Sequence, residues 1–261
     1  MKHIVPAALL IAALAVPAFA GSIPSGWSCN GACGTDGADG VVPLSPFNST
    51  SYEYITTTGG ITGVGYLPSG KLGSETNGSV LSTLDFSAPT DTLLNFYFDY
   101  VTSDGAGYAD YAWAALMNAS NNSEVALLFT ARTEPPPANI VPGTGMPPIS
   151  ATLNPSSVPI QSGTTWSPLG SWSGMCWDTG CGNSGWVDSQ YTIGTAGSYY
   201  LEFGVTNWLD EEYDSGMAID GVTINGQPIN PSSIPEPSSL LLLGSGLTAL
   251  AGMLRRRFAK A

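Results

Sequence analysis

Four aspartates beside glycine-containing turns are the side chains best suited to bind a metal ion. Asp104 and Asp110 bracket the turn in TSDGAGYADY, and Asp214 and Asp220 bracket the stretch DSGMAID. Loop carboxylates can gather around Ca²⁺, which accepts about six to eight oxygen ligands in irregular geometry. Aspartates also occupy turns simply because they hydrogen-bond their own backbone. The sequence predicts a structural calcium site with Asp220 as its first ligand, and solvated turn aspartates are the alternative.

The densest acidic run is WLDEEYD at 208–214, which contains Asp210, Glu211 and Glu212. None of the acidic stretches has the spacing of an EF-hand calcium loop. We interpret this run as a solvated edge or turn of the protein.

Three tryptophans crowd the second pair of cysteines in SWSGMCWDTGCGNSGW, namely Trp172, Trp177 and Trp186. Aromatic faces can stack on sugar rings, so exposed tryptophans on this loop could bind polysaccharide. The alternative is that they cap the core, because burying a tryptophan removes a large apolar area from water.

The N-terminus has the pattern of a secretory signal peptide. Lys2 and His3 precede an apolar run at 4–16, and small residues at Ala18 and Ala20 then predict cleavage before Gly21. An N-terminal membrane anchor is the alternative, but the run is shorter than the roughly 20 residues that a span needs. The sequence therefore predicts that the chain works outside the cytoplasm.

The sole histidine is His3, which leaves with the signal peptide. Its loss excludes Ser-His-Asp and Cys-His catalysis, and histidine-ligated zinc, from the mature protein. The chain also lacks a G-x-S-x-G motif. We expect no enzymatic activity, although a pair of carboxylates acting as a polysaccharide hydrolase stays open as an alternative.

Four cysteines form two close pairs, Cys29 with Cys33 and Cys176 with Cys181. In an oxidising compartment they should form disulfides, for which three connectivities exist. We favour the two local pairs. Cross-linking of the two loops is the alternative, and a metal-binding cysteine cluster is a further one whose spacings fit zinc poorly.

The charge of the exported region is strongly negative. Between 21 and 234 the basic residues are Lys71 and Arg132, against nineteen acidic ones, which gives a net charge of −17. Such a surface repels nucleic acid and anionic lipid and favours solubility or divalent cations. We expect no nucleic-acid partner.

Short alternating segments dominate the region from 21 to 225, and no segment keeps a helical period. Strands are expected over six segments: 79–86, 92–101, 111–118, 124–130, 198–205 and 216–224. Weaker candidates are 52–56 and the stretch around Val64. Half-buried strands of this kind build antiparallel sheets. The sequence predicts an all-β fold, a single antiparallel β-sandwich of jelly-roll type.

Two proline-rich segments interrupt this pattern. The stretch between Arg132 and Trp166 carries many prolines, which cannot donate to a strand ladder, and is expected to be a surface loop or a crossover between sheets. A domain boundary there is the alternative. Residues 226–234 are expected to be a linker.

The C-terminal segment has three parts in a fixed order. Pro235, Glu236 and Pro237 are followed by an uncharged apolar segment at 238–254 and then by Arg255, Arg256 and Arg257. The apolar segment is long enough for one short transmembrane helix, with the arginines on the cytoplasmic side. A permanent single-pass anchor is one interpretation.

This order at 235–261 resembles the PEP-CTERM sorting signal. The resemblance implies recognition by an exosortase, an integral-membrane transpeptidase-like enzyme that cuts near Pro-Glu-Pro. It implies export through the inner membrane of a Gram-negative bacterium, transient membrane anchoring, and release to the cell surface or extracellular matrix. Such bacteria make extracellular polysaccharide or biofilm.

The exported region itself resembles the uncharacterised β-sandwich domains that precede such tails. The resemblance rests on YFDYVTSDGAGYADYAWAAL at 97–116 and DSGMAIDGVTI at 214–224. It brings no assigned activity. We expect a cell-surface or matrix protein associated with biofilm polysaccharide, with a carbohydrate-binding module that uses the loop tryptophans as the alternative.

Overall fold

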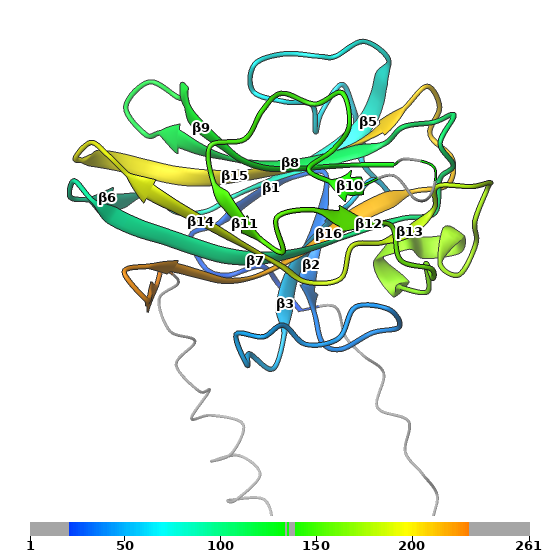
Figure 1. Cartoon of the computed structure of the whole chain (residues 1–261), viewed down its shortest axis with the longest axis horizontal. Coiled ribbons are helices and arrows are strands. Elements are labelled where there is room, and N and C mark those ends of the chain that lie inside the picture. The colour runs from blue at the N-terminus through cyan, green and yellow to red at the C-terminus, as the bar shows by residue number, and fades with distance from the viewer. Residues whose placement is uncertain (1–20, 134, 136–138, 230–261) are drawn as a thin grey trace, which may run out of the picture.

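Alternation of buried and more exposed side chains is clear in the first half of β7 (Thr92–Thr102) and in β15 (Gly197–Trp208), whereas β8 (Tyr111–Asn118) and β16 (Ser215–Ile224) are buried on both faces. The computed structural model describes residues 21–133, 135 and 139–229. In β7, Leu94, Phe96 and Phe98 are buried in the core. The predicted antiparallel β-sandwich is confirmed (Figure 1).

The strands of the described residues form two sheets and one small separate pair. The first sheet contains β1 (Ser28–Asn30), β4 (Ile61–Thr62), β5 (Glu75–Ser82), β6 (Phe86–Ala88), β8 (Tyr111–Asn118), β9 (Glu124–Arg132) and β15 (Gly197–Trp208). The second contains β2 (Ala32–Asp36), β3 (Tyr52–Thr56), β7, β11 (Thr152–Asn154), β13 (Gly182–Asn183), β14 (Val187–Ile193), β16 (Ser215–Ile224) and β17 (Gln227–Pro228). The separate pair is β10 (Asn139–Val141) with β12 (Val158–Pro159).

The strand order is that of a jelly roll. The central strands of the first sheet run β5-β15-β8-β9, and those of the second run β14-β7-β16-β3. If these eight strands are numbered in chain order from β3 to β16, the first sheet has the order 2-7-4-5. The second sheet has the order 6-3-8-1. Neighbouring strands are antiparallel throughout these central orders. Such double Greek-key connections close two sheets over one core.

Aromatic side chains from both sheets fill the space between them. Phe98 of β7 stacks on Phe129 of β9 with ring centroids 3.8 Å apart. Phe96 meets Phe203 of β15 edge to face at 5.4 Å. These contacts bury large apolar areas and fix how the sheets pack.

The outer face of each sheet is also partly covered. On the first sheet, Trp113 of β8 is buried and donates a hydrogen bond from Nε1 to the carbonyl oxygen of Gly65, 2.7 Å away. On the second, Trp166 is buried and donates to the hydroxyl of Tyr52 at 3.0 Å. Trp166 precedes the 3₁₀ helix η1 (Ser167–Trp172). Side chains from the segment 160–186 and from Val41 and Val42 together form this second cover.

The sequence predictions differ from the structure mainly at short strands. Segment 79–86 is divided between β5 and β6, and β14 was not expected. The proline-rich stretch carries β10, β11 and β12, because an extended chain needs few ladder donors at a sheet edge. Gln227 and Pro228, at the start of the expected linker, pair with β16.

The signal peptide at 1–20 and the tail at 235–261 lie outside the described residues. Among the residues that are described, none belongs to a helix with the length and apolar character needed to cross a bilayer.

Candidate functional site

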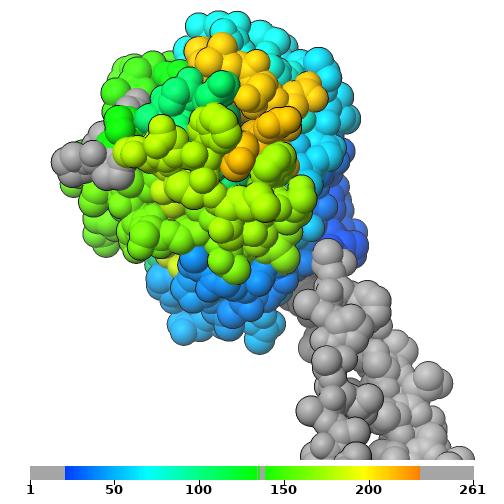
Figure 2. Space-filling view, turned by 90° about the vertical axis from the view of Figure 1, so that its right-hand side faces the viewer, coloured from blue at the N-terminus to red at the C-terminus, as the bar shows by residue number. Residues whose placement is uncertain are grey.

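Three loops meet at the end of the sandwich where β7 and β15 finish. The backbone N–H of Trp177 donates to the carbonyl oxygen of Ser103 at 3.0 Å, and that of Ser103 donates to the carbonyl of Asp214 at 3.2 Å. Ala106 is bonded in the same way to Thr179 at 2.8 Å. Figure 2 looks onto this end and shows the segment 160–186 in yellow-green beside the orange loop after β15. The loops therefore hold one another in place.

A disulfide closes the middle loop. Cys176 and Cys181 are bonded, with Cα atoms 5.7 Å apart, and Cys29 is bonded to Cys33 with Cα atoms 6.1 Å apart. The favoured local connectivity is confirmed. Because all four sulfurs are oxidised, the cross-linked arrangement and the metal-binding cluster are both excluded.

Four aromatic rings gather on this loop and its neighbours. Trp172 stacks on Tyr213 with centroids 4.3 Å apart, and Trp177 lies 5.2 Å from the same ring. Tyr108 meets Trp177 edge to face at 6.4 Å. Trp177 is 54% exposed. We call Tyr108, Trp172, Trp177 and Tyr213 the aromatic surface.

The third predicted tryptophan lies elsewhere. Trp186 donates from Nε1 to the carbonyl oxygen of Pro43 at 2.8 Å and packs edge to face on Tyr52. It belongs to the cover of the second sheet. Sequence reasoning missed Tyr108 and Tyr213, and only their neighbouring aspartates in GYADY and EEYDS pointed to these turns.

Beneath the aromatic surface lies a cavity of about 110 Å³, which we call the Asp104 cavity. It is lined by Asp104, Tyr108, Trp177, Asp210, Glu212 and Tyr213. Two members of the acidic run that the sequence suggested was a solvated edge, Asp210 and Glu212, thus face a cavity together with two loop aromatics.

Asp104 is 2% exposed, and its two carboxylate oxygens differ. Oδ1 accepts a hydrogen bond from the N–H of Gly105 at 2.7 Å. Oδ2 is buried without any hydrogen-bond partner. Burial, and to a smaller extent the nearby charge of Asp210, raise the pKa of Asp104 to about 7.

Asp110 lies behind Asp104 and has protein donors for both oxygens. Oδ1 accepts from the N–H of Trp208 at 2.8 Å, and Oδ2 accepts from the hydroxyl of Ser215 at 2.6 Å. Burial and then the charge of Asp104 hold the pKa of Asp110 well above its usual range. Asp110 thus joins strand ends, while Asp104 is left with a free oxygen.

The carboxylates of the other two predicted aspartates, Asp214 and Asp220, accept hydrogen bonds from hydroxyl groups of the protein. Asp214 accepts hydrogen bonds from Thr57 and Thr58, both at 2.7 Å. Asp220 is in a different place, at the far part of β16, where the strand faces Tyr97 of β7. Over the described ranges, no three acidic, histidine or cysteine side chains are grouped so that they could hold a metal ion. The structure brings Asp104 and Asp110 together and leaves Asp220 apart.

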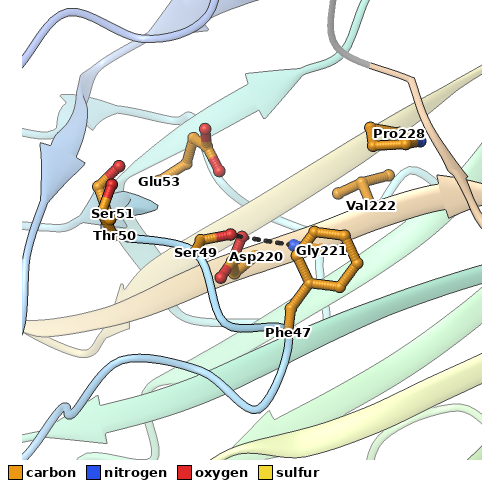
Figure 3. A pocket seen from close by; sticks show the side chains of 9 residues that line it. All are labelled: Phe47, Ser49, Thr50, Ser51, Glu53, Asp220, Gly221, Val222 and Pro228. Atoms are coloured by element: carbon orange, nitrogen blue, oxygen red, sulfur yellow. Dashed lines mark hydrogen bonds between the residues drawn. The ribbon is translucent and has the colours of Figure 1, made fainter. Parts of the chain in front are cut away.

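Asp220 lies in a second pocket of about 300 Å³, which we call the Asp220 pocket (Figure 3). Its oxygens accept hydrogen bonds from the hydroxyl of Ser49 at 2.9 Å, from the N–H of Gly221 at 2.6 Å and from the hydroxyl of Ser45. Glu53 of the neighbouring strand β3 lines the same pocket. Burial, and then the charge of Asp220, raise the pKa of Glu53 to about 7.

Comparison with known proteins identifies the C-terminal region. Residues 233–257 match the family model of the PEP-CTERM protein-sorting motif. The chain carries a PEP-CTERM sorting motif. The matched range contains Pro235-Glu236-Pro237 and Arg255-Arg256-Arg257, which lie outside the described residues. The motif implies processing by an exosortase and a surface or extracellular location.

Two solved structures are similar to the sandwich at a low level. The K1 cleaved adhesin domain of Lys-gingipain from Porphyromonas gingivalis W83 shares 15% identity, over 79% of this chain and 94% of that one, with a TM-score of 0.36. The K3 domain of the same protein shares 14% identity, over 77% and 93%, with a TM-score of 0.34. Similarity this low does not bear on activity. No curated protein matches the PEP-CTERM chain in sequence.

Proposed function

We propose that this PEP-CTERM protein is a non-enzymatic component of the cell surface or extracellular matrix that binds biofilm polysaccharide through the aromatic surface. The sorting motif at 233–257 supports the location. The single observation that carries the binding role is the exposure of Trp177, which keeps 54% of its surface in water although it stands among three other rings.

The aromatic surface is held rigidly, and rigidity favours binding. The backbone N–H of Trp177 donates to the carbonyl oxygen of Ser103. The preceding residue, Cys176, is fixed by its disulfide bond to Cys181. A hypothetical Cβ at Gly105 would lie 3.1 Å from Cδ1 of Trp177, so only glycine leaves the indole its full room. A ring fixed before binding loses little conformational entropy when a sugar stacks on it.

The charge of the exported region limits the choice of polysaccharide. With a net charge of −17, the protein surface repels anionic polymers. Neutral or cationic glycans are therefore the better partners.

Affinity electrophoresis through gels that contain polysaccharide tests the proposal. Trp177→Ala should weaken retention about tenfold or more, equivalent to about 1.4 kcal/mol of binding free energy. Tyr66→Ala is the matched control, because it removes an aromatic ring of 36% exposure beside Lys71, away from the aromatic surface. Equal retention of wild type and Trp177→Ala would overturn the binding role.

The non-enzymatic part has its own test. Glu53 and Asp220 are the carboxylates that share the Asp220 pocket, and both oxygens of Asp220 already accept hydrogen bonds from the protein. We therefore expect no release of reducing sugar ends from any bound polysaccharide. Release that disappears in Glu53→Gln would contradict this and make the Asp220 pocket a hydrolase site.

A further inference from the structure

We propose that the Asp104 cavity binds an ammonium group, so that the glycan taken by the aromatic surface is one that carries free amines, such as a deacetylated hexosamine polymer. This inference deepens the proposed polysaccharide-binding function and rests on it. It starts from an unbalanced electrostatic environment in the cavity.

The cavity has three carboxylates and no basic side chain in its lining. The two basic residues of the exported region are engaged elsewhere. Lys71 donates to the carbonyl of Glu75 at 3.3 Å, and the guanidinium of Arg132 lies 4.7 Å from the ring of Trp208 and donates from Nε to the carbonyl of Ala109 at 3.1 Å. The carboxylates of the cavity therefore lack a cationic partner among the described residues, and a cationic ligand would supply one.

One buried carboxylate oxygen of a residue that lines the cavity lacks a hydrogen-bond donor. Oδ2 of Asp104 accepts nothing from the protein, although the residue is 2% exposed. Leaving a buried carboxylate oxygen unpaired costs free energy that a donated N–H would recover. A charged N–H donor makes a stronger bond than a neutral hydroxyl. This oxygen points to a ligand group that is both a donor and a cation.

The aromatic lining separates an organic ammonium from a metal ion. Calcium needs about six to eight oxygen ligands. The three carboxylates that line the cavity are not grouped closely enough to hold a metal ion, and neither are any other three acidic side chains in the described part of the chain. The rings of Tyr108, Trp177 and Tyr213 line the cavity instead. Ring faces attract organic cations through the cation–π interaction.

The Asp104 cavity is small and lies beside an exposed ring. Its volume of about 110 Å³ compares with about 300 Å³ for the Asp220 pocket. In the proposed complex the ammonium substituent lies in the cavity, and the sugar ring that carries it stacks on the exposed face of Trp177.

The experiment compares two oligosaccharides that differ only in acetylation. Isothermal titration calorimetry at near-neutral pH measures the exported protein against glucosamine oligomers and N-acetylglucosamine oligomers of equal length. We expect the free-amine oligomer to bind about tenfold or more tightly than the acetylated one. Asp104→Asn should remove this preference, and Asp85→Asn, which removes one acidic charge away from the cavity, should keep it.

Each other outcome overturns the inference in a distinct way. If both oligomers bind equally and Trp177→Ala abolishes both, the polysaccharide function stands and the ammonium site fails. If neither these oligomers nor any polysaccharide binds, both proposals fail. If polylysine binds as tightly as the glucosamine oligomer, the assignment to an amino sugar is wrong. If Ca²⁺ alone binds and Asp104→Asn abolishes it, the cavity is a metal site.

Discussion

The Asp104 cavity and the Asp220 pocket each hold a buried aspartate, but the two are treated differently by their surroundings. Asp220 receives hydrogen bonds from Ser45, Ser49 and Gly221, so the protein itself satisfies the carboxylate. Asp104 receives one hydrogen bond from Gly105, and its second oxygen has none. The comparison teaches that burial alone does not mark a functional carboxylate. An oxygen without a donor points to a ligand only where its residue also lines a cavity, since the fully buried Asp99 has such an oxygen and lines neither of these two pockets.

The largest effect that sharpens this comparison is a dependence of stability on pH. Burial raises the pKa of Asp99 from 3.8 to about 7, and Asp104 and Glu53 reach about 7 as well. A group whose pKa is higher in the folded than in the unfolded protein makes its full contribution to stability below the unfolded pKa. This contribution is lost as the pH rises through the folded pKa. We expect the free energy of unfolding to fall between about pH 4 and pH 7.

Asp99 sets the scale of this effect because it is fully buried. Each unit of pKa difference corresponds to about 1.4 kcal/mol, so Asp99 alone accounts for on the order of 4 kcal/mol. Urea unfolding at a series of pH values measures it, and Asp99→Asn should flatten the curve. A stability that is constant across this window in the wild type would contradict the prediction. Glu75, whose pKa is lowered by the hydrogen bond from Tyr111 in spite of burial, works in the opposite sense but below pH 4.5.

The next effect is the loss of the acceptor for the hydrogen-bond donors around Asp220. Asp220→Ala leaves the hydroxyl of Ser45, the hydroxyl of Ser49 and the N–H of Gly221 without their acceptor. Each buried donor left unpaired costs about 1 to 3 kcal/mol, so we expect a destabilisation of about 3 kcal/mol in urea unfolding. Asp220→Asn keeps one acceptor oxygen and should lose less. If Asp220→Ala were as stable as the wild type, Asp220 would not be structural and the contrast with Asp104 would collapse.

A smaller effect concerns the loop closed by the disulfide between Cys176 and Cys181, which carries Trp177 of the Asp104 cavity. Replacing both Cys176 and Cys181 by serine opens a loop of sequence separation 5. The chain-entropy relation gives a loss of about 2 kcal/mol for so short a loop. Removal of the pair Cys29 and Cys33, with separation 4, is the matched control: it should cost a similar amount of stability yet leave polysaccharide binding intact. Equal loss of binding in both variants would show that the disulfide at Cys176 does not position the aromatic surface.

The sequence predicts the sandwich well because strand alternation is a local signal. The segment 111–118 is expected and found as a strand with the same bounds, and 52–56 likewise. Strand β14 escapes because VDSQYTI alternates weakly in hydrophobicity. Its burial comes from pairing with β7, and the hydroxyl of Ser189 donates to the carbonyl oxygen of Leu128 in β9.

The site is harder to predict, since it depends on which loops meet. Local sequence marks Trp177 and Asp104 as candidates, but nothing local indicates that Tyr213 stacks on Trp172 or that Asp210 faces the same cavity. Trp186 is close to Trp177 in sequence and still belongs to another surface, because β13 intervenes and its indole is bonded to Pro43. The same limit explains why the four aspartates look alike in the sequence and differ in the structure.

The most direct test of the comparison is a substitution of Asp104 itself. Asp104→Asn keeps the shape of the side chain and removes a charge that the protein does not neutralise. At a pH of about 8, where the raised pKa leaves Asp104 ionised, we expect the variant to be more stable than the wild type, by at most on the order of 4 kcal/mol on the relation used for Asp99. Below a pH of about 4 the carboxyl is protonated in the folded and the unfolded protein, so the two proteins should unfold at the same urea concentration. A variant that is destabilised at both pH values would mean that Asp104, like Asp220, holds the fold together.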